Sequence, residues 1–373
     1  NWMDVAVSAE TGLYQLTCVN GGYIYYSTNR GDNWISSSVN IDGVATQTTN
    51  RAWQAVANSA NGQYGLACVN STTASGFLYR SENFGSTWIS NNIAIEGGGS
   101  QQVTSRPWQD VGMSANGKYQ VACINSNTQT QSISSIQSAV SIMVPPPGAM
   151  ATAFGTSWTQ RGEDIDGEAV GDQSGYSVSL SADGTVVAVG APMNFGANGR
   201  ESGQVRVYAL NGANAWIQRG ADIDGAVGLS SLPMVVTATG TSGSRDWRSV
   251  AYSATGQYQT AVVNVGQIYT SSDYGINWTP RYNIANWRSV SLSSTGQYQT
   301  AVAYQGQIHT SSDFGINWTP RHSSYDGYGW ISVSLSSTGQ YQTAVINGDK
   351  IYTSSDYGIN WTRVIAFISA STT

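Results

Sequence analysis

Charged residues are scarce in this chain of 373 residues. They make up 10% of the sequence, against roughly 25% in an average soluble protein, and Lys118 and Lys350 are its only lysines. The formal net charge of -6 arises from few groups, so the chain offers no dense basic surface for a polyanion. We therefore expect no nucleic acid among its partners.

Other absences narrow the function classes further. No apolar run reaches the ~18 residues that a membrane-spanning helix needs, so we expect no membrane span. The only two histidines, His309 and His322, make neither a zinc site nor a Ser-His-Asp triad. The chain begins at Asn1 and shows no secretory leader, which suggests a processed or excised piece whose targeting sequence has been removed.

The three cysteines occupy the same place in three successive repeats. Cys18, Cys68 and Cys123 lie in the segments Leu-Thr-Cys-Val-Asn, Leu-Ala-Cys-Val-Asn and Val-Ala-Cys-Ile-Asn. Equivalent positions in neighbouring sheets face the same kind of core. We expect small buried hydrophobic residues here, rather than a disulfide, a metal ligand or a nucleophile.

Repetition is what the sequence has in abundance. Segment 351–361 is repeated almost unchanged at 268–278 and 308–318, and each copy reads as a strand, a tight turn on Asp-Tyr/Phe-Gly, and a Trp that opens the next strand. Seven tryptophans take this hairpin position, and six open a unit. The hairpin set is Trp34, Trp88, Trp158, Trp216, Trp278, Trp318 and Trp361; the opening set is Trp2, Trp53, Trp108, Trp247, Trp287 and Trp330. None of the 13 is left over, so we expect all of them to be packing residues.

Each unit reads as four antiparallel strands. Opening tryptophans 40 and 43 residues apart (Trp247, Trp287 and Trp330) are typical of propeller blades, which must stack to bury their apolar faces. We predict an all-β fold, a single seven-bladed β-propeller of four-stranded antiparallel blades over residues 1–373. The predicted blades are 1–40, 51–92, 106–162, 174–220, 245–282, 286–322 and 329–365, with an insertion loop at 126–149. Segment 364–369 is expected either to add a closing strand or to lead to something missing.

The hairpin motif resembles a known repeat. Ser-x-Asp-x-Gly-x-x-Trp at 271–278, 311–318 and 354–361 is similar to the Asp-box, or BNR repeat, of sialidases, sortilin-type receptors, xyloglucanases and photosystem assembly factors. This resemblance implies a β-propeller. The fourth unit instead resembles the FG-GAP repeat of integrin-like proteins, through segments 175–178, 189–192 and 203–208. That repeat often holds calcium in an Asp-x-Asn-x-Asp-Gly loop, whereas the matching loop here is only Ala182-Asp183-Gly184.

The chemistry of the box favours a structural role. An Asp in a tight turn accepts backbone hydrogen bonds, a Gly supplies the positive φ, and the Trp covers the hairpin. We interpret the following as structural Asp-box residues: Asp273, Gly275, Trp278, Asp313, Gly315, Trp318, Asp356, Gly358 and Trp361. We single out no catalytic residue.

Length varies mainly on one face of the predicted disc. The links between units and the loops between second and third strands hold most of the insertions, notably 126–149 and 193–202, whereas the opposite turns are uniform. Insertions gathered on one face usually mark the interacting face. We expect these two inserts either to cover the disc or to dock a neighbouring copy in self-assembly.

Three arginines on that face are candidate ligand-binding residues. Arg51, Arg106 and Arg245 each stand two residues before an opening Trp, where their guanidinium groups would converge over the central channel. The sialidase resemblance implies that such a trio holds a carboxylate, since guanidinium forks match carboxylate geometry. The chain lacks the Phe/Tyr-Arg-Ile-Pro segment of sialidases and an evident tyrosine–glutamate pair. The alternative is independent rim arginines paired with nearby Asp.

Four acidic residues recur after the fourth strands. Asp42, Glu96, Asp166 and Asp224 are candidate Ca²⁺ ligands, because hard carboxylate oxygens at loop positions suit that ion. The alternative is a solvated link that ends in Asp-Gly turn chemistry.

These patterns predict a non-catalytic recognition or assembly module outside the cell, or on a particle or cell surface. Its expected partner is a glycan or a surface protein, and it needs no cofactor unless Ca²⁺ occupies the link residues. Two alternatives stay open. One is a glycoside hydrolase, either sialidase-like through the three arginines or built on a carboxylate pair of link residues. The other is a purely structural subunit of a filament, capsid or surface layer.

Overall fold

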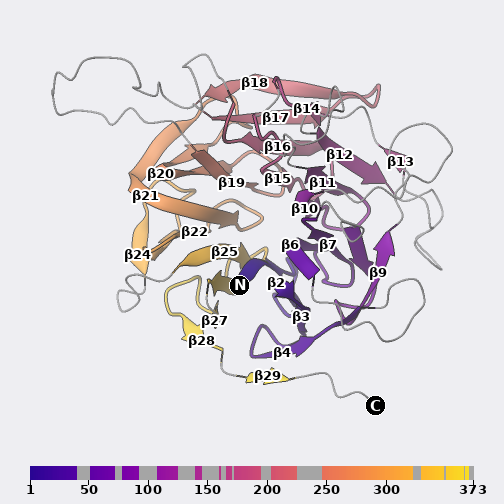
Figure 1. Cartoon of the computed structure of the whole chain (residues 1–373). Coiled ribbons are helices and arrows are strands. Elements are labelled where there is room, and N and C mark those ends of the chain that lie inside the picture. Colours follow the sequence, from indigo (N-terminus) through magenta and orange to yellow (C-terminus); the bar gives the residue numbers. More distant parts are fainter. Residues whose placement is uncertain are drawn as a thin grey trace.

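A computed structural model describes residues 1–39, 51–71, 78–91, 107–124, 139–144, 159–160, 165–169, 172–194, 203–224, 246–321, 329–347, 350–364 and 366–368. Every regular element in these segments is a β-strand. Narrow sheets surround a common centre, with the first strand of each sheet toward the middle (Figure 1). The predicted all-β fold is confirmed, and the arrangement is that of a β-propeller. No helix in the described residues has the length and hydrophobicity for crossing a membrane.

The strands follow one another in antiparallel units that run from the centre outward. Unit 1 comprises β1 (Trp2–Val7), β2 (Gln15–Gly22), β3 (Ile24–Ser27) and β4 (Asn33–Ser36). Unit 2 comprises β6 (Arg51–Asn58), β7 (Gly65–Val69), β8 (Leu78–Ser81) and β9 (Thr87–Asn91). In unit 3, β10 (Trp108–Met113), β11 (Gln120–Ile124) and β12 (Ala139–Val144) are joined by the short β13 (Thr159–Gln160) and β14 (Ile165–Asp166). Unit 4 comprises β15 (Ser177–Leu180), β16 (Val186–Ala191), β17 (Gln204–Leu210) and β18 (Trp216–Asp224).

Units 5 and 6 share one long strand. In unit 5, β19 (Asp246–Tyr252) and β20 (Gln259–Ser271) lead to β21 (Thr279–Leu292). The second half of β21 is also the first strand of unit 6, which continues with β22 (Gln299–Ala303), β23 (Ile308–Ser311) and β24 (Thr319–Arg321). Unit 7 comprises β25 (Trp330–Leu335), β26 (Gln342–Ile346), β27 (Lys350–Ser354) and β28 (Thr362–Arg363). The count of seven blades and their limits stay predictions, because several predicted limits fall outside the described residues.

The ring closes between unit 7 and unit 1. Trp2 and Trp34 of unit 1 share a buried cluster with Val345 and Ile351 of unit 7. After unit 7, β29 (Ala366–Ile368) pairs in parallel with β4, and the short β5 (Ser38–Val39) pairs in parallel with β9 in the same way. After units 1 and 7, the chain therefore adds a fifth strand to the next unit. The closing-strand alternative for segment 364–369 is the one observed.

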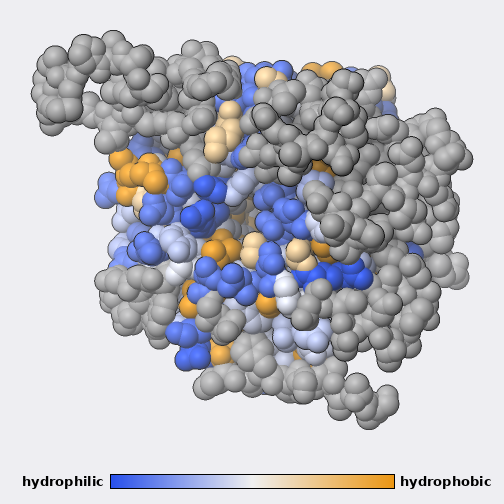
Figure 2. Space-filling model, viewed as in Figure 1, coloured by the Kyte–Doolittle hydropathy of each residue, from blue (hydrophilic) through white to orange (hydrophobic). Residues whose placement is uncertain are grey.

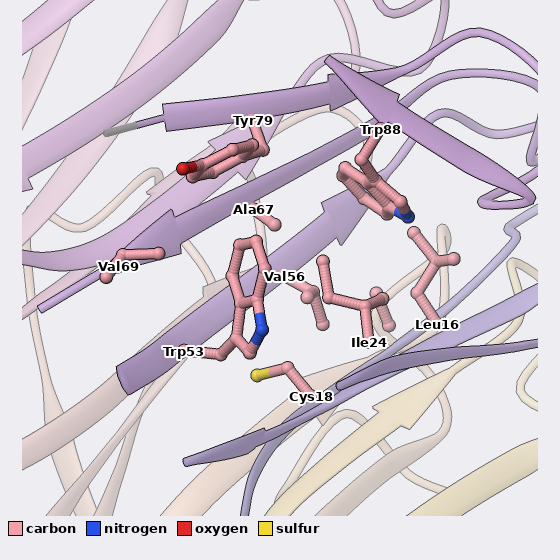
Figure 3. Close-up of a cluster of buried hydrophobic side chains, with 10 residues drawn as sticks. Leu16, Cys18, Ile24, Trp53, Val56, Ala67, Val69, Tyr79 and Trp88 are labelled. Atoms are coloured by element: carbon pink, nitrogen blue, oxygen red, sulfur yellow. The ribbon is translucent and has the colours of Figure 1, made fainter. Parts of the chain in front are cut away.

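The hydrophobic core lies between neighbouring units. In the cluster of Figure 3, Leu16, Cys18 and Ile24 of unit 1 pack against Trp53 and other residues of unit 2. The ring centroids of Trp53 and Tyr79 are 4.9 Å apart in an edge-on contact. Aromatic rings bury large apolar areas, so each opening Trp fastens two units together.

The described tryptophans follow the packing prediction. Those that are buried are Trp2, Trp34, Trp53, Trp88, Trp108, Trp247, Trp287, Trp318, Trp330 and Trp361. Trp216 and Trp278 are partly buried and pack against neighbouring clusters, while Trp158 lies outside the described residues. The three cysteines are buried and free, as expected.

Candidate binding face at the centre of the ring

Six of the first strands contain a bulge directly after the opening Trp. The register shifts between Trp2 and Asp4, and at the same place in units 2, 3, 5, 6 and 7. A bulge leaves one residue out of the ladder and re-aims its side chain. These residues are partly exposed, together with Tyr176 at the same place in unit 4. We call them the rim set: Met3, Gln54, Gln109, Tyr176, Arg248, Arg288 and Ile331.

Side-chain chemistry changes from unit to unit at the rim position but is constant two residues further along the strand. Two residues further along each strand, every unit has the same valine: Val5, Val56, Val111, Val178, Val250, Val290 and Val333. The blade therefore does not need a particular side chain at the rim position. In Figure 2, the described residues near the middle of this face are mostly hydrophilic, with a few hydrophobic ones among them.

Two arginines of the rim set contact tyrosine rings, one across a unit boundary and one within unit 6. The Arg248 guanidinium carbon lies 5.1 Å from the ring centroid of Tyr176, the rim residue of the preceding unit, and Arg248 also donates a hydrogen bond to the Tyr176 hydroxyl. The Arg288 guanidinium carbon lies 5.0 Å from the ring centroid of Tyr304. Two guanidinium groups are thus held against tyrosine rings, in contacts that fix a cation without neutralising it.

The predicted arginine trio is only partly placed. Arg51 begins β6, and its guanidinium carbon lies 5.1 Å from the ring centroid of Tyr79. Arg106 and Arg245 lie outside the described residues, so their convergence with Arg51 stays a prediction. Arg248 and Arg288 were missed by sequence reasoning, although the repeated Trp-Arg-Ser at 247–249 and 287–289 was a signal for them.

The predicted Ca²⁺ ligands are also incompletely placed. Asp42 and Glu96 lie outside the described residues. Asp166 pairs with Ala139 in the ladder between β14 and β12, and Asp224 pairs with Gln204 between β18 and β17. Within the described segments, no three His, Cys, Asp or Glu residues are gathered closely enough to hold a metal. Ca²⁺ at these four residues stays a prediction.

Two carboxylates on the first strands clamp neighbouring units together. Asp4 Oδ2 accepts a hydrogen bond from the Val56 N–H of unit 2 at 3.0 Å, and Asp110 Oδ2 accepts one from the Val178 N–H of unit 4 at 2.8 Å. Burial raises the pKa of Asp4 to about 6 and the pKa of Asp110 to about 8. Ser289, at the same strand position, accepts from the unit 7 backbone in the same way. The strand position of these carboxylates is therefore one that accepts a backbone hydrogen bond from the next unit.

The Asp-boxes are hydrogen bonded within their own hairpins. Asp313 Oδ1 accepts from the Asn317 N–H at 2.9 Å and from the Ser311 hydroxyl at 2.8 Å, while the Trp318 indole donates to the Gly315 carbonyl at 2.9 Å. The boxes at Asp273 and Asp356 repeat this pattern. Partial burial acts to raise the pKa of Asp313, but the hydrogen bonds from Asn317 and Ser311 outweigh it and lower the pKa. Gly315 has φ +78°, which only Gly adopts freely.

The described histidine is a core residue. His309 is 8% exposed, and its ring centroid lies 5.0 Å from that of Trp287 and 4.9 Å from that of Tyr282. Burial lowers its pKa to about 4, so it is neutral at physiological pH. His322 lies outside the described residues.

Comparisons with known proteins agree with this geometry. The family described as BNR-Asp box repeat matches residues 268–280, 308–320 and 351–364. No curated protein sequence matches the chain significantly. Among solved structures, Kuenenia stuttgartiensis hydrazine synthase is similar over 97% of this chain and 94% of its own, with 12% identity and a TM-score of 0.57.

A second similar structure is YCF48 from Cyanidioschyzon merolae, over 95% of each chain, with 11% identity and a TM-score of 0.56. YCF48 bound to D1 peptide matches over 98% of this chain and 91% of its own, with 12% identity and a TM-score of 0.55. At these identities the similarity concerns the fold. The chain is a β-propeller that carries BNR-Asp box repeats.

Proposed function

We propose that the chain is a non-catalytic recognition propeller, displayed outside a cell or on a particle surface, that binds a protein or glycan through the rim set. The observation that carries this proposal is the variation at the rim position. Seven repeats keep the same valine two residues away and change the rim side chain from Met to Gln, Tyr, Arg or Ile. A position that the blade leaves free is where a propeller gains ligand specificity.

The chemistry of the rim set suits recognition. Arg and Tyr are enriched among residues that dominate binding energy, because they combine flat apolar area with hydrogen-bond donors. Arg248 and Arg288 are already held against Tyr176 and Tyr304, so binding would cost less side-chain entropy. YCF48, which shares the fold, has been solved with a D1 peptide, and a peptide is therefore the first ligand class to test.

The two alternative functions, glycoside hydrolase and structural subunit, predict different experimental results. A glycoside hydrolase needs a carboxylate pair. The buried carboxylates of the first strands, Asp4 and Asp110, already accept hydrogen bonds from the next unit's backbone. A structural subunit would assemble through its inserts, predicted at 126–149 and 193–202. The first prediction was wrong in part, because 139–144 of that segment is strand β12, which pairs with β11 as the third strand of unit 3. The low lysine content and neutral polar strands favour surface display, but they fit a recognition module and a structural subunit equally well.

The test is a binding screen of the whole chain on peptide and glycan arrays. For the ligand found, Arg288→Ala and Arg248→Ala should each weaken binding at least about tenfold, as expected for hot-spot arginines. Arg363→Ala is the matched control, because Arg363 lies exposed on the outer strand β28, and it should bind normally.

Three outcomes contradict the proposal. Full affinity in both Arg248→Ala and Arg288→Ala would show that the ligand binds somewhere other than the rim set. Hydrolysis of fluorogenic glycosides that disappears in Asp110→Asn would identify a hydrolase. Concentration-dependent assembly without any ligand, measured by light scattering, would identify a structural subunit.

A further inference from the structure

A buried polar cluster lies where the chain enters unit 4. Asp172, Asn194 and Gln204 are each 1% exposed and come from the link, from just after β16 and from the start of β17. The Asn194 amide donates to Asp172 Oδ2 at 3.0 Å and to Glu168 Oε2 at 3.1 Å. The Gln204 amide donates to Glu168 Oε2 at 3.3 Å, and the Ala169 N–H donates to Asp172 Oδ2 at 2.7 Å. The cluster thus joins the link to both ends of the loop between the second and third strands.

Three oxygens of this region lack partners among the described residues. Asp172 Oδ1, Gln204 Oε1 and Ser174 Oγ are buried and accept no hydrogen bond. Asp172 and Gln204 are 1% exposed and Ser174 is 0% exposed, so bulk water does not satisfy them. Unpaired buried oxygens carry a desolvation penalty, which a bound species would remove. The Gln204 oxygen belongs to the same amide group whose nitrogen donates to Glu168, so it lies at the edge of this cluster.

The charges leave the cluster negative. The Glu168 side chain is exposed, and its Oε1 lies 3.8 Å from Arg206 Nη1, whose positive charge offsets its own. Among the described residues no cation is paired with Asp172. A cationic ligand would therefore be attracted to Asp172, and a second anion would be repelled.

The types of donor atom in the cluster favour Ca²⁺ over other metal ions. A carboxylate, an amide carbonyl and a hydroxyl are all hard oxygen donors, and the cluster offers no sulfur or imidazole nitrogen for zinc. Ca²⁺ accepts six to eight oxygens in flexible geometry, including amide carbonyls and water, whereas Mg²⁺ requires a near-ideal octahedron. We propose that Asp172, Gln204 and Ser174, with Glu168 at the mouth, form a Ca²⁺ site that ties the link to the second loop of unit 4.

This site differs from the acidic link residues considered from sequence. None of those four residues is among its proposed ligands, although Asp224 adjoins it as the ladder partner of Gln204. With one uncompensated carboxylate, affinity should lie at the weak end of protein Ca²⁺ sites, around 10⁻⁴–10⁻³ M, which is the range of extracellular modules. The inference is independent of the proposed recognition function, since the ion would be structural whatever the ligand of the rim set.

The test measures thermal unfolding of the whole chain in CaCl₂ and in MgCl₂ up to about 10 mM, together with Tb³⁺ luminescence. Tyr208 lies beside the cluster, since the Arg206 guanidinium carbon is 5.6 Å from its ring centroid, and can sensitise Tb³⁺. Ca²⁺ should raise the unfolding temperature by a few degrees and displace Tb³⁺, whereas Mg²⁺ should do neither. Asp172→Asn should abolish both responses. Asp183→Asn, on the exposed turn of the same unit, should keep both.

A second variant keeps the test decisive if Asp172→Asn does not fold. Gln204→Glu adds a carboxylate beside Glu168 and should increase Ca²⁺ affinity about tenfold, since ligand charge tunes affinity. Unchanged Ca²⁺ affinity in Gln204→Glu, equal effects of Ca²⁺ and Mg²⁺, or Tb³⁺ luminescence that survives Asp172→Asn would each overturn the site and assign its oxygens to buried water.

Discussion

The Ser332 hydroxyl donates a hydrogen bond of 2.6 Å to Asp4 Oδ1, although the two residues are 328 positions apart in the chain. The same carboxylate accepts the Val56 N–H of unit 2. One side chain thus joins unit 7, unit 1 and unit 2 on the inner wall. Non-covalent bonds such as these close the ring.

Removing the Ser332 hydroxyl, which joins unit 7 to unit 1, should destabilise the folded protein. Ser332→Ala is expected to lower the free energy of unfolding by about 1.5–3 kcal/mol, as for a hydrogen bond to a charged group. Ser289→Ala removes a longer bond, of 3.3 Å, to the backbone N–H of Val333 and should cost about 1 kcal/mol. Urea denaturation of both variants measures the difference. Equal losses of folding free energy in the two variants would show that the contact between units 7 and 1 is no stronger than the contact between units 6 and 7.

The buried Asp110 should make stability fall as pH rises. Burial raises its pKa from 3.8 to about 8, so the folded state holds a proton that the unfolded chain has released. The loss of folding free energy caused by ionising buried Asp110 is absent below pH 3.8, grows as pH rises above that value, and is complete above about pH 8. Between pH 5 and 9, Asp110→Asn should therefore gain stability relative to wild type by about 2–4 kcal/mol.

Thermal or urea unfolding at several pH values measures this gain. Asp183→Asn is the control, because hydrogen bonds lower the pKa of this exposed carboxylate and it is ionised in both states throughout that range. A constant difference between Asp110→Asn and wild type from pH 5 to 9 would contradict the raised pKa.

The Asp-box carboxylates should affect stability and leave binding unchanged. Asp313→Ala removes the bonds to Asn317 and Ser311 and should cost about 1–2 kcal/mol, as for the loss of a capping side chain. Asp32→Ala is the control, at an exposed position of the unit 1 hairpin, and should stay within about 0.5 kcal/mol of wild type. Loss of ligand binding in a folded Asp313→Ala protein would instead give the box a direct role.

The three thiols should be unreactive in the folded protein. Cys18, Cys68 and Cys123 are each 0% exposed, and burial raises the pKa of each thiol well above its usual value. Ellman's reagent should therefore label no thiol in native buffer and all three in denaturant. Rapid labelling of any one of them without loss of structure would show that its strand opens locally.

The sequence was sufficient for the parts of the fold that depend on local chemistry. Asp313, Gly315 and Trp318 repeat a turn whose hydrogen bonds lie within a few residues, so spacing alone predicts it. The tryptophans recur at two equivalent positions in the units, so their spacing predicts where the strands of each unit begin. The sequence does not decide the course of segment 364–369, because the parallel pairing of Ala366 with Asn33 depends on the closed ring.

The site was less predictable. Trp247-Arg248-Ser249 reads as ordinary strand alternation, and only the observed register shift shows that Arg248 leaves the ladder. Sequence reasoning therefore selected Arg51, Arg106 and Arg245 from their distance to the Trp. The cluster at unit 4 was invisible for another reason, since Glu168 and Gln204 are 36 positions apart and meet only through the fold.

Strand β21 runs without a break from the outer edge of unit 5 to the inner wall of unit 6, pairing first with β20 and then with β22. No loop lies between these two halves, and Arg288 of the rim set stands in the second half. The strand therefore connects perimeter and centre through one paired backbone, with register shifts on the unit 5 side and the bulge at Arg288 on the unit 6 side. We expect a displacement of Thr279 at the perimeter to be passed to the inner wall through this paired backbone.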